Sequence, residues 1–580
     1  MKGKQITPIE VSNIEALSED SFSSQLLRPF NKLLSKEIFK KIFSSLPLVA
    51  IIFGSLIVRV IAAGESQGFV HPDEVFQAIE MVHFRLFGEY GTGQTIPWEY
   101  DLNKAYGGAR SWFFVFILVG VYRFAMLFGI TDPLSLVFVA RLFLSTFSIV
   151  TVLVAYYFGK EIFNKRIGLL SAFLCGFWWF FPFWSSRTMT DSISTDFVFL
   201  SLFLAYKSIK AKYSFNKRFL YALISGLSIG VAFMLRFPSA LMGIPILLFI
   251  LLKPYAKNIG KGMRNLGIKT ISFFKKEPVS SIGEIQKMKR PPNALKQLEV
   301  SAWFCIGAFF MVIVQGLLDL FTWGGFLHSP INFFRYNIVE GLSAIHGSSP
   351  WYTYFTGVFT DFASYFAPLL IMFFIFGFSY KKRVKSKIMV LSIIIFWLII
   401  FSSLAHKEFR FIMTILPLCM IMVAAGIERV VTVLRSKRNQ HILLSFILVF
   451  LGSTSLFLAN YNFKFMWKWN SGICNAMYWV GQQEDVETVI VFEGVWYTGG
   501  YAYLNVDVTC YFERISYFMF PQNPTYNSSY FRYLYTQKGT YVVVRNYELY
   551  IVEDILTSLN MTIVADVFGY PYAKVFTQIS

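Results

Sequence analysis

The sequence predicts an all-α polytopic membrane protein that ends in a small C-terminal α/β domain. Of its 580 residues, 55% are hydrophobic and 19% aromatic, whereas only 15% are charged. No soluble domain of this length buries so much apolar surface. Apolar runs of about 18 to 25 residues recur along the chain, which is the length that crosses roughly 30 Å of hydrocarbon. Residues 462–580 differ, because short apolar runs there (TVIVF, YVVVRN, MTIVADV) indicate strands, and ELYIVEDILTSL indicates a helix.

The multi-spanning domain is expected over residues 46–461. Counting ambiguous segments, we expect about 11 to 13 membrane helices. The clear apolar spans are 46–63, 134–158, 166–184, 194–208, 218–235, 238–253, 300–321, 361–379, 386–405, 410–430 and 441–461.

Residues 111–130 (SWFFVFILVGVYRFAMLFGI) are apolar but fit poorly as a span. If they crossed the membrane once, the basic loop GKEIFNKR at 159–166 would fall on the same side as HPDE at 71–74. The later basic loops would then follow it to that side. If the segment instead lies in the membrane or re-enters it, all the basic loops share the other side. We therefore predict that residues 111–130 do not span.

Basic residues concentrate in the short loops between spans, which is the orientation signal of a membrane protein. The N-terminal segment 1–45 and the loop 254–299 are therefore expected in the cytosol. This distribution accounts for the net charge of +19 without a nucleic-acid partner. The 254–299 loop is either a solvated segment or a contact for anionic lipid.

The polar clusters that could carry chemistry sort to the opposite side. Two N-glycosylation sequons, at Asn527 and Asn560, fall there as well. Cys474 and Cys510 in the tail either form a disulfide or stay free. The clusters are HPDEVFQAIE at 71–80, SSRTMTD at 185–191, the break at Arg236, the loop 322–360, HKEFR at 406–410 and the tail.

Paired acids follow the first span, in the loop 64–110. Asp73 and Glu74 come directly after His71 and Pro72. Proline starts helices and the first helical turn favours negative charge, so one explanation is a structural helix cap. The alternative is a sugar-handling surface, because polar and aromatic side chains crowd the rest of this loop, and ionisable groups near membrane depth are costly.

A second cluster, HKEFR, lies between two strongly apolar spans. His406, Lys407 and Arg410 could clamp a phosphate group at the membrane surface. The alternative is ordinary snorkelling of long side chains at helix ends. Arg187 and Arg236 lie on the same side, and the acids that either could pair with are Asp191, Asp196 and Asp319.

Carboxylates and several cations on one membrane face suit a particular reaction class. An attacking hydroxyl needs a carboxylate base, and a lipid-phosphate leaving group needs cations. The sequence shows no metal-ligand spacing, P-loop or glycine-rich dinucleotide turn. The pattern is therefore suggestive of glycosyl transfer from a polyprenyl-phosphate sugar.

Several segments, in order, resemble the membrane mannosyltransferases of glycosyltransferase family 22: HPDEVFQAIEMVHFRLFGEYG, PWEY, GARSW and HKEFRFIMTILPLCM. The segments SSRTMTDSISTD, LRFPSALMGIPILLF and RYNIVEGLSAIHGSSPWYTYF extend this resemblance over most of residues 46–430. It implies the GT-C fold, with inverting transfer of mannose from dolichyl phosphate mannose on the lumenal membrane face. A eukaryotic protein would reside in the endoplasmic reticulum membrane, and a prokaryotic relative would work at the plasma membrane.

The resemblance is strongest to the enzyme that adds the third mannose, in α-1,2 linkage, to the glycosylphosphatidylinositol (GPI) precursor. His71 resembles the fourth-mannose enzyme instead, and the lipid-linked N-glycan precursor is a further possible acceptor. A metal requirement and protein partners stay open.

The same resemblance implies roles for individual residues. Asp73 is the implied catalytic carboxylate, which activates the acceptor hydroxyl, and Glu74 assists it. The residues implied to hold the dolichyl phosphate are Arg187, Arg236, His406, Lys407 and Arg410. The residues implied to line the sugar site are Trp98, Glu99, Arg110 and Trp351, with His71 and Gln77 as further substrate-binding residues.

Two other classes of protein remain to be separated from an enzyme. A transporter or flippase usually places charges near the bilayer midplane, in broken helices and paired repeats. Here the charges gather at loop ends on one side, and no internal repeat is visible. A non-catalytic scaffold of the same fold would differ by showing no substrate turnover.

Overall fold

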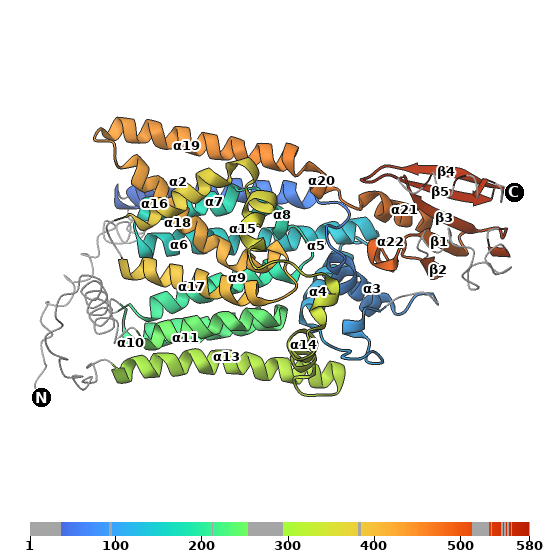
Figure 1. Cartoon of the computed structure of the whole chain (residues 1–580), viewed down its shortest axis with the longest axis horizontal. Helices are drawn as coiled ribbons and strands as arrows, with labels where there is room; N and C mark the ends of the chain where they lie inside the picture. Colours follow the sequence, from blue (N-terminus) through green and yellow to red (C-terminus); the bar gives the residue numbers. More distant parts are fainter. Residues whose placement is uncertain are drawn as a thin grey trace, which may run out of the picture.

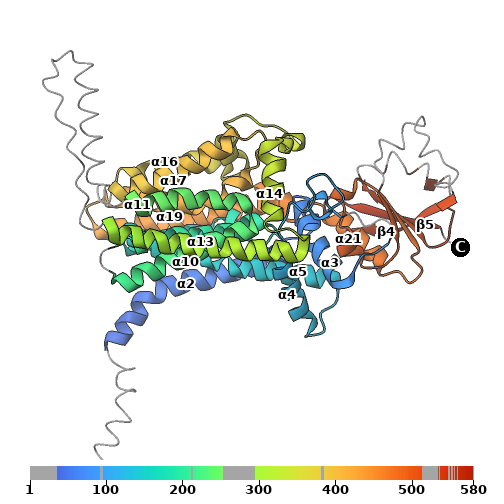
Figure 2. The same cartoon turned by 90° about the horizontal axis from the view of Figure 1, so that it is seen from below.

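The computed structural model describes residues 36–91, 96–210, 213–252, 294–380, 384–512 and, with shorter gaps, 533–578. Long helices run side by side in a bundle, and a small α/β domain lies at one end of it (Figure 1, Figure 2). Most of the predicted cytosolic segments 1–45 and 254–299 lie outside the described residues, as does the sequon at Asn527.

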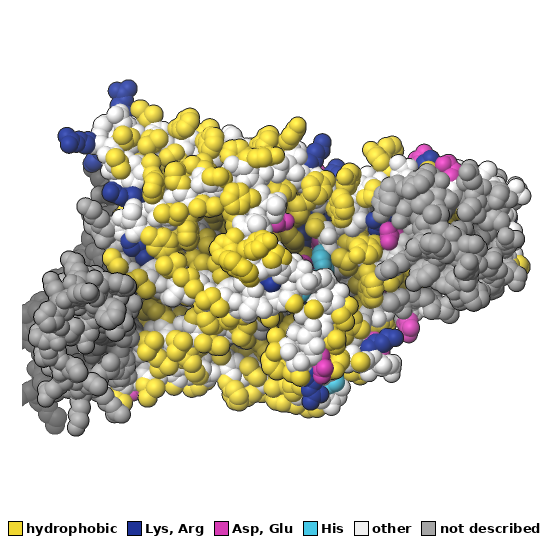
Figure 3. All heavy atoms as spheres, viewed as in Figure 1, with side chains coloured by type: hydrophobic (Ala, Val, Ile, Leu, Met, Phe, Trp, Pro, Cys, Tyr) yellow, Lys and Arg dark blue, Asp and Glu magenta, His cyan; other side chains and the backbone are white. Residues whose placement is uncertain are grey.

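The bundle has the length and composition of a multi-pass membrane protein. Within the described residues, seven helical segments are long and apolar enough to cross a membrane, or eight if a bent pair counts as one span. Hydrophobic side chains cover the visible flank of the bundle, as a lipid-facing surface requires (Figure 3). The seven segments are Ser45–Glu65, Pro133–Ile162, Phe215–Leu235, Leu295–Trp323, Val384–Ser403, Phe409–Val431 and Lys437–Asn462.

Every predicted span falls on helices of this bundle, although several are shorter than expected or broken. The predicted span 361–379 departs most, because Thr353–Phe362 and Ser364–Phe378 meet at 118°. The helices are α2 (Lys36–Glu65), α5 (Pro133–Phe147), α6 (Ile149–Ile162), α7 (Lys165–Phe177), α8 (Phe180–Ser185), α9 (Thr190–Ser208), α10 (Phe215–Leu235), α11 (Gly243–Leu252), α13 (Ala294–Trp323), α16 (Ala367–Phe378), α17 (Val384–Ser403), α18 (Leu416–Val431) and α19 (Lys437–Phe457).

The ambiguous segment 111–130 forms the short helix α4 (Phe113–Met126), of 14 residues. About 20 residues are needed to span a bilayer, so α4 is too short to cross alone. It lies where the bundle meets the α/β domain (Figure 1). This agrees with the prediction that the segment is not a span.

Local sequence signals start the helices that follow. Asp132 accepts a hydrogen bond from the backbone N–H of Ser135 at 2.9 Å, and Pro133 is the first residue of α5. Asn164 caps α7 in the same way, through the N–H of Ile167 at 3.0 Å. Such caps satisfy backbone donors that the first turn leaves unpaired.

Helices α10 and α13 approach each other unusually closely, and glycines make this possible. A Cβ at Gly226 would lie 2.0 Å from the carbonyl oxygen of Phe304, and a Cβ at Gly307 would lie 2.3 Å from that of Leu223. Small residues at a helix interface allow this backbone contact in membranes.

The C-terminal domain is a five-stranded sheet with strand order β2-β1-β3-β5-β4. Strand β1 (Thr488–Phe492) pairs in parallel with β2 (Thr509–Phe512) and β3 (Thr540–Arg545). Strand β5 (Ala573–Gln578) pairs antiparallel with β3 and with β4 (Met561–Val567).

The three predicted strands are confirmed, whereas β2 and β5 were not predicted. The predicted helix at 548–559 falls largely outside the described residues. Helix α21 (Ser471–Gly481) packs against this sheet. Cys474 and Cys510 are both buried and free, so the structure contains no disulfide between them.

Candidate active site

The paired acids lie in the loop between α2 and α5, where the bundle meets the α/β domain. After Pro72 the chain enters a π-helical turn, Val75–Ile79, which continues directly into α3 (Glu80–Phe87). Insertions of this kind in helices occur frequently at functional sites. The backbone N–H of Asp73 donates to Nδ1 of His71 at 3.2 Å, which places the Asp73 carboxylate at the start of the helical segment.

Arg410 is the centre of the charged cluster. Its guanidinium is 6% exposed and contacts three carboxylates, one of which is that of Asp73, 337 residues earlier in the chain. Nη2 donates to Oδ2 of Asp73 at 2.9 Å and Nε donates to Oε2 of Glu408 at 2.6 Å, while Nη1 lies 3.7 Å from Oδ2 of Asp191. The structure thus brings HPDE and HKEFR together.

Asp73 is held in its ionised form. Burial by itself would raise the pKa of this carboxyl, but the charges of His71 and Arg410 outweigh burial and hold the pKa well below its usual range. The Asp73 side chain keeps 21% of its surface exposed. Asp73 is therefore a charged, reachable acceptor at the end of the bundle.

Glu74 has a different environment from its neighbour. It is 1% exposed, and its Oε1 accepts the backbone N–H groups of Val70 and His71 at 2.7 and 3.3 Å. Its Oε2 lies 3.7 Å from Nη1 of the fully buried Arg187. Glu74 thus braces the loop through the residues that precede it, and its side chain accepts no helix-capping hydrogen bond.

Arg187 also binds backbone groups and does not face a solvent-accessible site. Its guanidinium donates to the carbonyl oxygens of Gln67 at 3.3 Å and of Met466 at 2.6 Å. These bonds join the start of the loop 64–110 to the chain that enters the C-terminal domain. The predicted pairing of Arg187 with Asp191 or a later acid is not what the structure shows, because Glu74 takes that place.

Glu408 was not among the predicted site residues, yet it neutralises the cluster from within HKEFR. Burial opposes its ionisation, but the charge of Arg410 and the hydrogen bond from His406 keep its pKa low. His406 Nε2 lies 2.9 Å from Oε1 of Glu408, and this bond raises the pKa of His406 despite partial burial. His71 Nε2 lies 3.7 Å from the same oxygen.

Arg236 pairs with Asp191, as one of the open alternatives predicted. Its Nε lies 3.0 Å from Oδ1 of Asp191, and both side chains are buried. Asp191, which also contacts Arg410, belongs to the cluster although it was not a predicted site residue. A sequence signal existed, since Asp191 lies in the first turn of an apolar helix.

A second group of polar side chains comes from later in the same loop. Gln77 donates to Oε1 of Glu99 at 2.8 Å, and Trp98 stacks on Tyr336 with ring centroids 4.1 Å apart. Burial raises the pKa of Glu99 to about 7, with Arg110 opposing and Asp73 adding to the shift. The Glu99 carboxyl therefore changes between its protonated and ionised forms near neutral pH.

Lys407 and Trp351 do not join either group. The Lys407 ammonium, 8% exposed, donates to the carbonyl oxygen of Ser349 at 2.8 Å and to that of Leu404. The Trp351 side chain is 66% exposed and contacts Tyr352 and Phe355. Within the described residues, no group of three or more His, Cys, Asp or Glu side chains is placed to hold a metal ion.

The family model of the Alg9-like mannosyltransferases matches residues 50–505. The chain belongs to this family. Among similar relatives, the mannosyltransferase APTG1 of Arabidopsis thaliana is 26% identical over 368 residues, which cover 63% of this chain and 56% of that protein. The GPI alpha-1,2-mannosyltransferase 3 of Bos taurus is 25% identical over 354 residues, covering 60% and 53%. The chain thus spans about half the length of these relatives.

The fold of this Alg9-like chain is similar to that of a solved structure. The crystal structure of ArnT from Cupriavidus metallidurans bound to undecaprenyl phosphate matches with a TM-score of 0.55 and 12% identity. The match covers 92% of this chain and 98% of that chain. It shows the fold alone, which is the expected GT-C fold.

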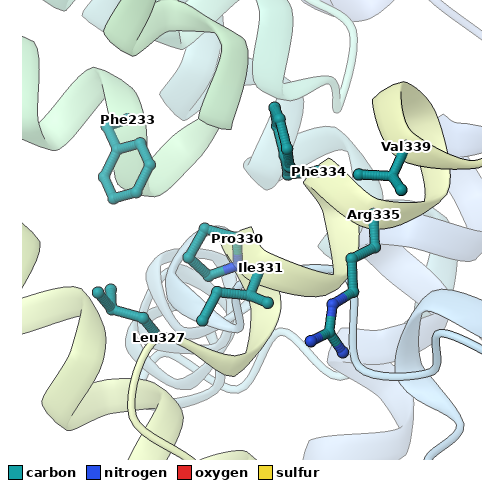
Figure 4. Close-up of a pocket in the computed structure, with 7 residues that line it drawn as sticks. All are labelled: Phe233, Leu327, Pro330, Ile331, Phe334, Arg335 and Val339. Atoms are coloured by element: carbon teal, nitrogen blue, oxygen red, sulfur yellow. The ribbon is translucent and has the colours of Figure 1, made fainter.

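An apolar pocket of about 410 Å³ lies near the second polar group of the Alg9-like chain. Phe233 of α10 faces Pro330 and Ile331 of α14 (His328–Phe334), and Arg335 extends beside them (Figure 4). The adjacent ring of Phe333 lies 5.8 Å below the guanidinium of Arg110. Arg335 was not among the predicted site residues. Leu327, Phe334 and Val339 complete the lining.

Proposed function

We propose that this chain transfers mannose from dolichyl phosphate mannose to a lipid-linked glycan. The acceptor we favour is the GPI precursor, which receives its third mannose in α-1,2 linkage. The observation that carries the proposal is Asp73, an ionised and partly exposed carboxylate fixed by Arg410 at the end of a membrane bundle. The names of the relatives, GPI alpha-1,2-mannosyltransferase 3 among them, support the choice of sugar and acceptor.

In the proposed reaction, Asp73 accepts the proton of the acceptor hydroxyl. The hydroxyl oxygen forms a bond to C1 of mannose while the bond between C1 and the phosphate oxygen breaks. Dolichyl phosphate leaves with that electron pair, and a single displacement converts a β-linked donor into an α-linked product. A base must be ionised to act, and the lowered pKa of Asp73 ensures this throughout the neutral range.

Glu99 is a second carboxylate for the sugar. Because its pKa lies at about 7, a large fraction of molecules carry a proton on Glu99 near neutral pH. A protonated carboxyl donates a hydrogen bond, so Glu99 can hold a mannose hydroxyl beside the Trp98–Tyr336 stack. Aromatic faces paired with hydrogen-bonding groups suit a sugar ring.

The cations available for the phosphate differ from those expected. Arg187, Arg236 and Arg410 are committed to carboxylates or carbonyls. Arg110 has a buried Nε without a hydrogen-bond partner among the described residues. The exposed Arg335 borders the apolar pocket. We therefore assign the phosphate to Arg110 and Arg335.

The apolar pocket fits the part of the lipid next to the phosphate. Its lining is apolar apart from Arg335, so an isoprenoid chain can enter it with the phosphate at the charged edge. ArnT, whose fold is similar, was solved with undecaprenyl phosphate, a lipid of the same chemical kind.

We place this site at the lumenal face of the endoplasmic reticulum membrane. The catalytic loop and the sheet lie at the same end of the bundle (Figure 1). The basic loops of the sequence are expected on the other side of the membrane, which the positive-inside rule assigns to the cytosol. The relatives named as GPI mannosyltransferases support this compartment.

The test is a transfer assay with purified protein in lipid, labelled dolichyl phosphate mannose and two acceptors. A two-mannose GPI precursor and a lipid-linked N-glycan precursor are offered in parallel. Label on the GPI lipid would support the full proposal. Label on the N-glycan lipid, or on a three-mannose GPI precursor, would keep the enzyme class and overturn the acceptor. Transport of an unmodified lipid without transfer would refute the proposal.

A further inference from the structure

The catalytic loop contains a third acid, Glu80, which the charged cluster does not use. It is the first residue of α3 and is 1% exposed. Its Oε1 accepts the backbone N–H of Tyr501 at 3.2 Å, and its Oε2 accepts that of Ala502 at 2.8 Å. A buried carboxylate is costly unless hydrogen bonds satisfy it, and here the donors come from the C-terminal domain.

The C-terminal domain is shaped around this carboxylate. Gly500 has a φ of +62°, which L side chains rarely adopt, and a Cβ there would lie 2.5 Å from Oε2 of Glu80. Glycine is therefore required both for the backbone conformation and for the close approach of Glu80. The contact constrains both partners.

Glu80 lies between further attachments that join the loop to the C-terminal domain. At the loop's start, Phe69 N–H donates to the carbonyl oxygen of Trp469 at 2.9 Å. At its end, Gly91 N–H donates to Oδ1 of Asp507 at 2.6 Å. Between these, the helical segment shares a buried hydrophobic core with α21 and strands β1 and β3, and α3 lies against α22 (Tyr501–Leu504) in Figure 1.

Glu80 and Asp73 belong to one continuous helical segment. The π-helical turn Val75–Ile79 joins them, and the N–H of Glu80 donates to the carbonyl oxygen of Val75. Seven residues of helix span about 10 Å, so a tilt at Glu80 displaces the carboxylate of Asp73. The bundle holds Asp73 from one side through Arg410, and the C-terminal domain holds its helix from the other.

We propose that Glu80 is a positioning residue for the transfer reaction, and that the C-terminal α/β domain is part of the active-site framework. Through Glu80, this domain fixes the orientation of the helix that carries Asp73. The proposal rests on the proposed function, because it assumes that Asp73 acts in transfer.

The test compares Glu80→Gln with wild type in the full chain. Glutamine keeps the shape, but its amide NH₂ replaces one acceptor and leaves a backbone N–H unpaired. We expect turnover to fall about 10- to 100-fold with the KM for donor nearly unchanged, since a small misplacement of the base affects mainly the chemical step. Amides of residues 66–91 should also exchange hydrogen faster. Glu493→Gln is the matched control, because Glu493 pairs with Arg545 at 3.3 Å inside the same domain.

A second variant approaches the contact from the opposite side. Gly500→Ala should reproduce the effect of Glu80→Gln, and the two losses should not add in the double variant because both break one contact. Wild-type turnover and exchange in Glu80→Gln would overturn the proposal, as would additive losses or a decrease only in the amount of folded protein. If wild type transfers no mannose, the proposed function fails, whereas faster exchange confined to residues 66–91 would still support the attachment.

Discussion

Replacing Arg410 with methionine should destabilise the protein more than any other single loss of a cation in the loops. The substitution keeps much of the side-chain volume but leaves Asp73, Glu408 and Asp191 without their shared partner. Removing one member of a buried ion pair costs about 3–5 kcal/mol. Asp73 and Glu408 are 21% and 23% exposed, so solvent screens part of their repulsion. We therefore expect about 3 kcal/mol, at the lower end of that range.

The assay is thermal unfolding of purified protein in detergent, followed by tryptophan fluorescence, with transfer activity measured in parallel. Arg85→Met is the matched control, since Arg85 is an exposed cation of α3 that lies 3.8 Å over the ring of Trp112. Losing this contact should cost about 0.5–1 kcal/mol. The Arg410 variant should unfold several degrees lower and lose transfer activity, and the control should do neither. Equal unfolding temperatures in the two variants would refute the view of Arg410 as the organising charge.

Three further outcomes are expected. Because burial raises the pKa of Glu99 to about 7, wild-type transfer should decline as pH rises through neutrality and Glu99 loses its proton. The amide of Glu99→Gln donates a hydrogen bond at every pH, so this variant should show a flatter pH profile. A pH profile identical to that of wild type would remove Glu99 from sugar binding. Trp351→Ala should keep turnover within about twofold, since exposed substitutions have small effects, and a larger loss would return Trp351 to the sugar site. Asn560 is exposed just before β4 and should carry an N-glycan when the protein is expressed in eukaryotic cells. Asn560→Gln should remove this glycan and increase the mobility of the protein on a gel. An unmodified Asn560 would count against the lumenal placement.

The membrane architecture could be predicted because it depends on local apolar runs. Each predicted span falls on helices of the bundle, and the resemblance carried by HPDE and HKEFR leads to the family that the comparisons show. Strands β2 and β5 were missed for a local reason as well. TCYF is only four residues long, and AKVFTQ mixes polar and apolar residues, so neither stands out from a loop.

The two neighbouring acids of HPDE have different surroundings that the sequence pattern does not predict. Successive residues of a helix point about 100° apart, so adjacent carboxylates face different surroundings. Asp73 reaches Arg410, whereas Glu74 turns inward to backbone N–H groups. Sequence alone treats them as a pair, because only the tertiary structure supplies the partner on each side.

The cations of HKEFR show the same limit of sequence pattern. HKEFR reads as three positive charges, but Glu408 between them accepts hydrogen bonds from Arg410 and pairs with His406. Lys407 turns to backbone carbonyls. A charge in sequence shows that a site is polar, and only its partners show whether that charge is available to a ligand.

The most direct test of the account is the transfer rate of Asp73→Asn under single turnover, with the enzyme in excess over the labelled donor and the acceptor saturating. Asparagine keeps the size of the side chain and can still meet Arg410 through its oxygen, but it is not a base. We predict that product formation falls at least about 100-fold, as expected for loss of a general base, while donor binding measured separately is retained. Product formation at the wild-type rate would contradict the account and leave Asp73 with a structural role.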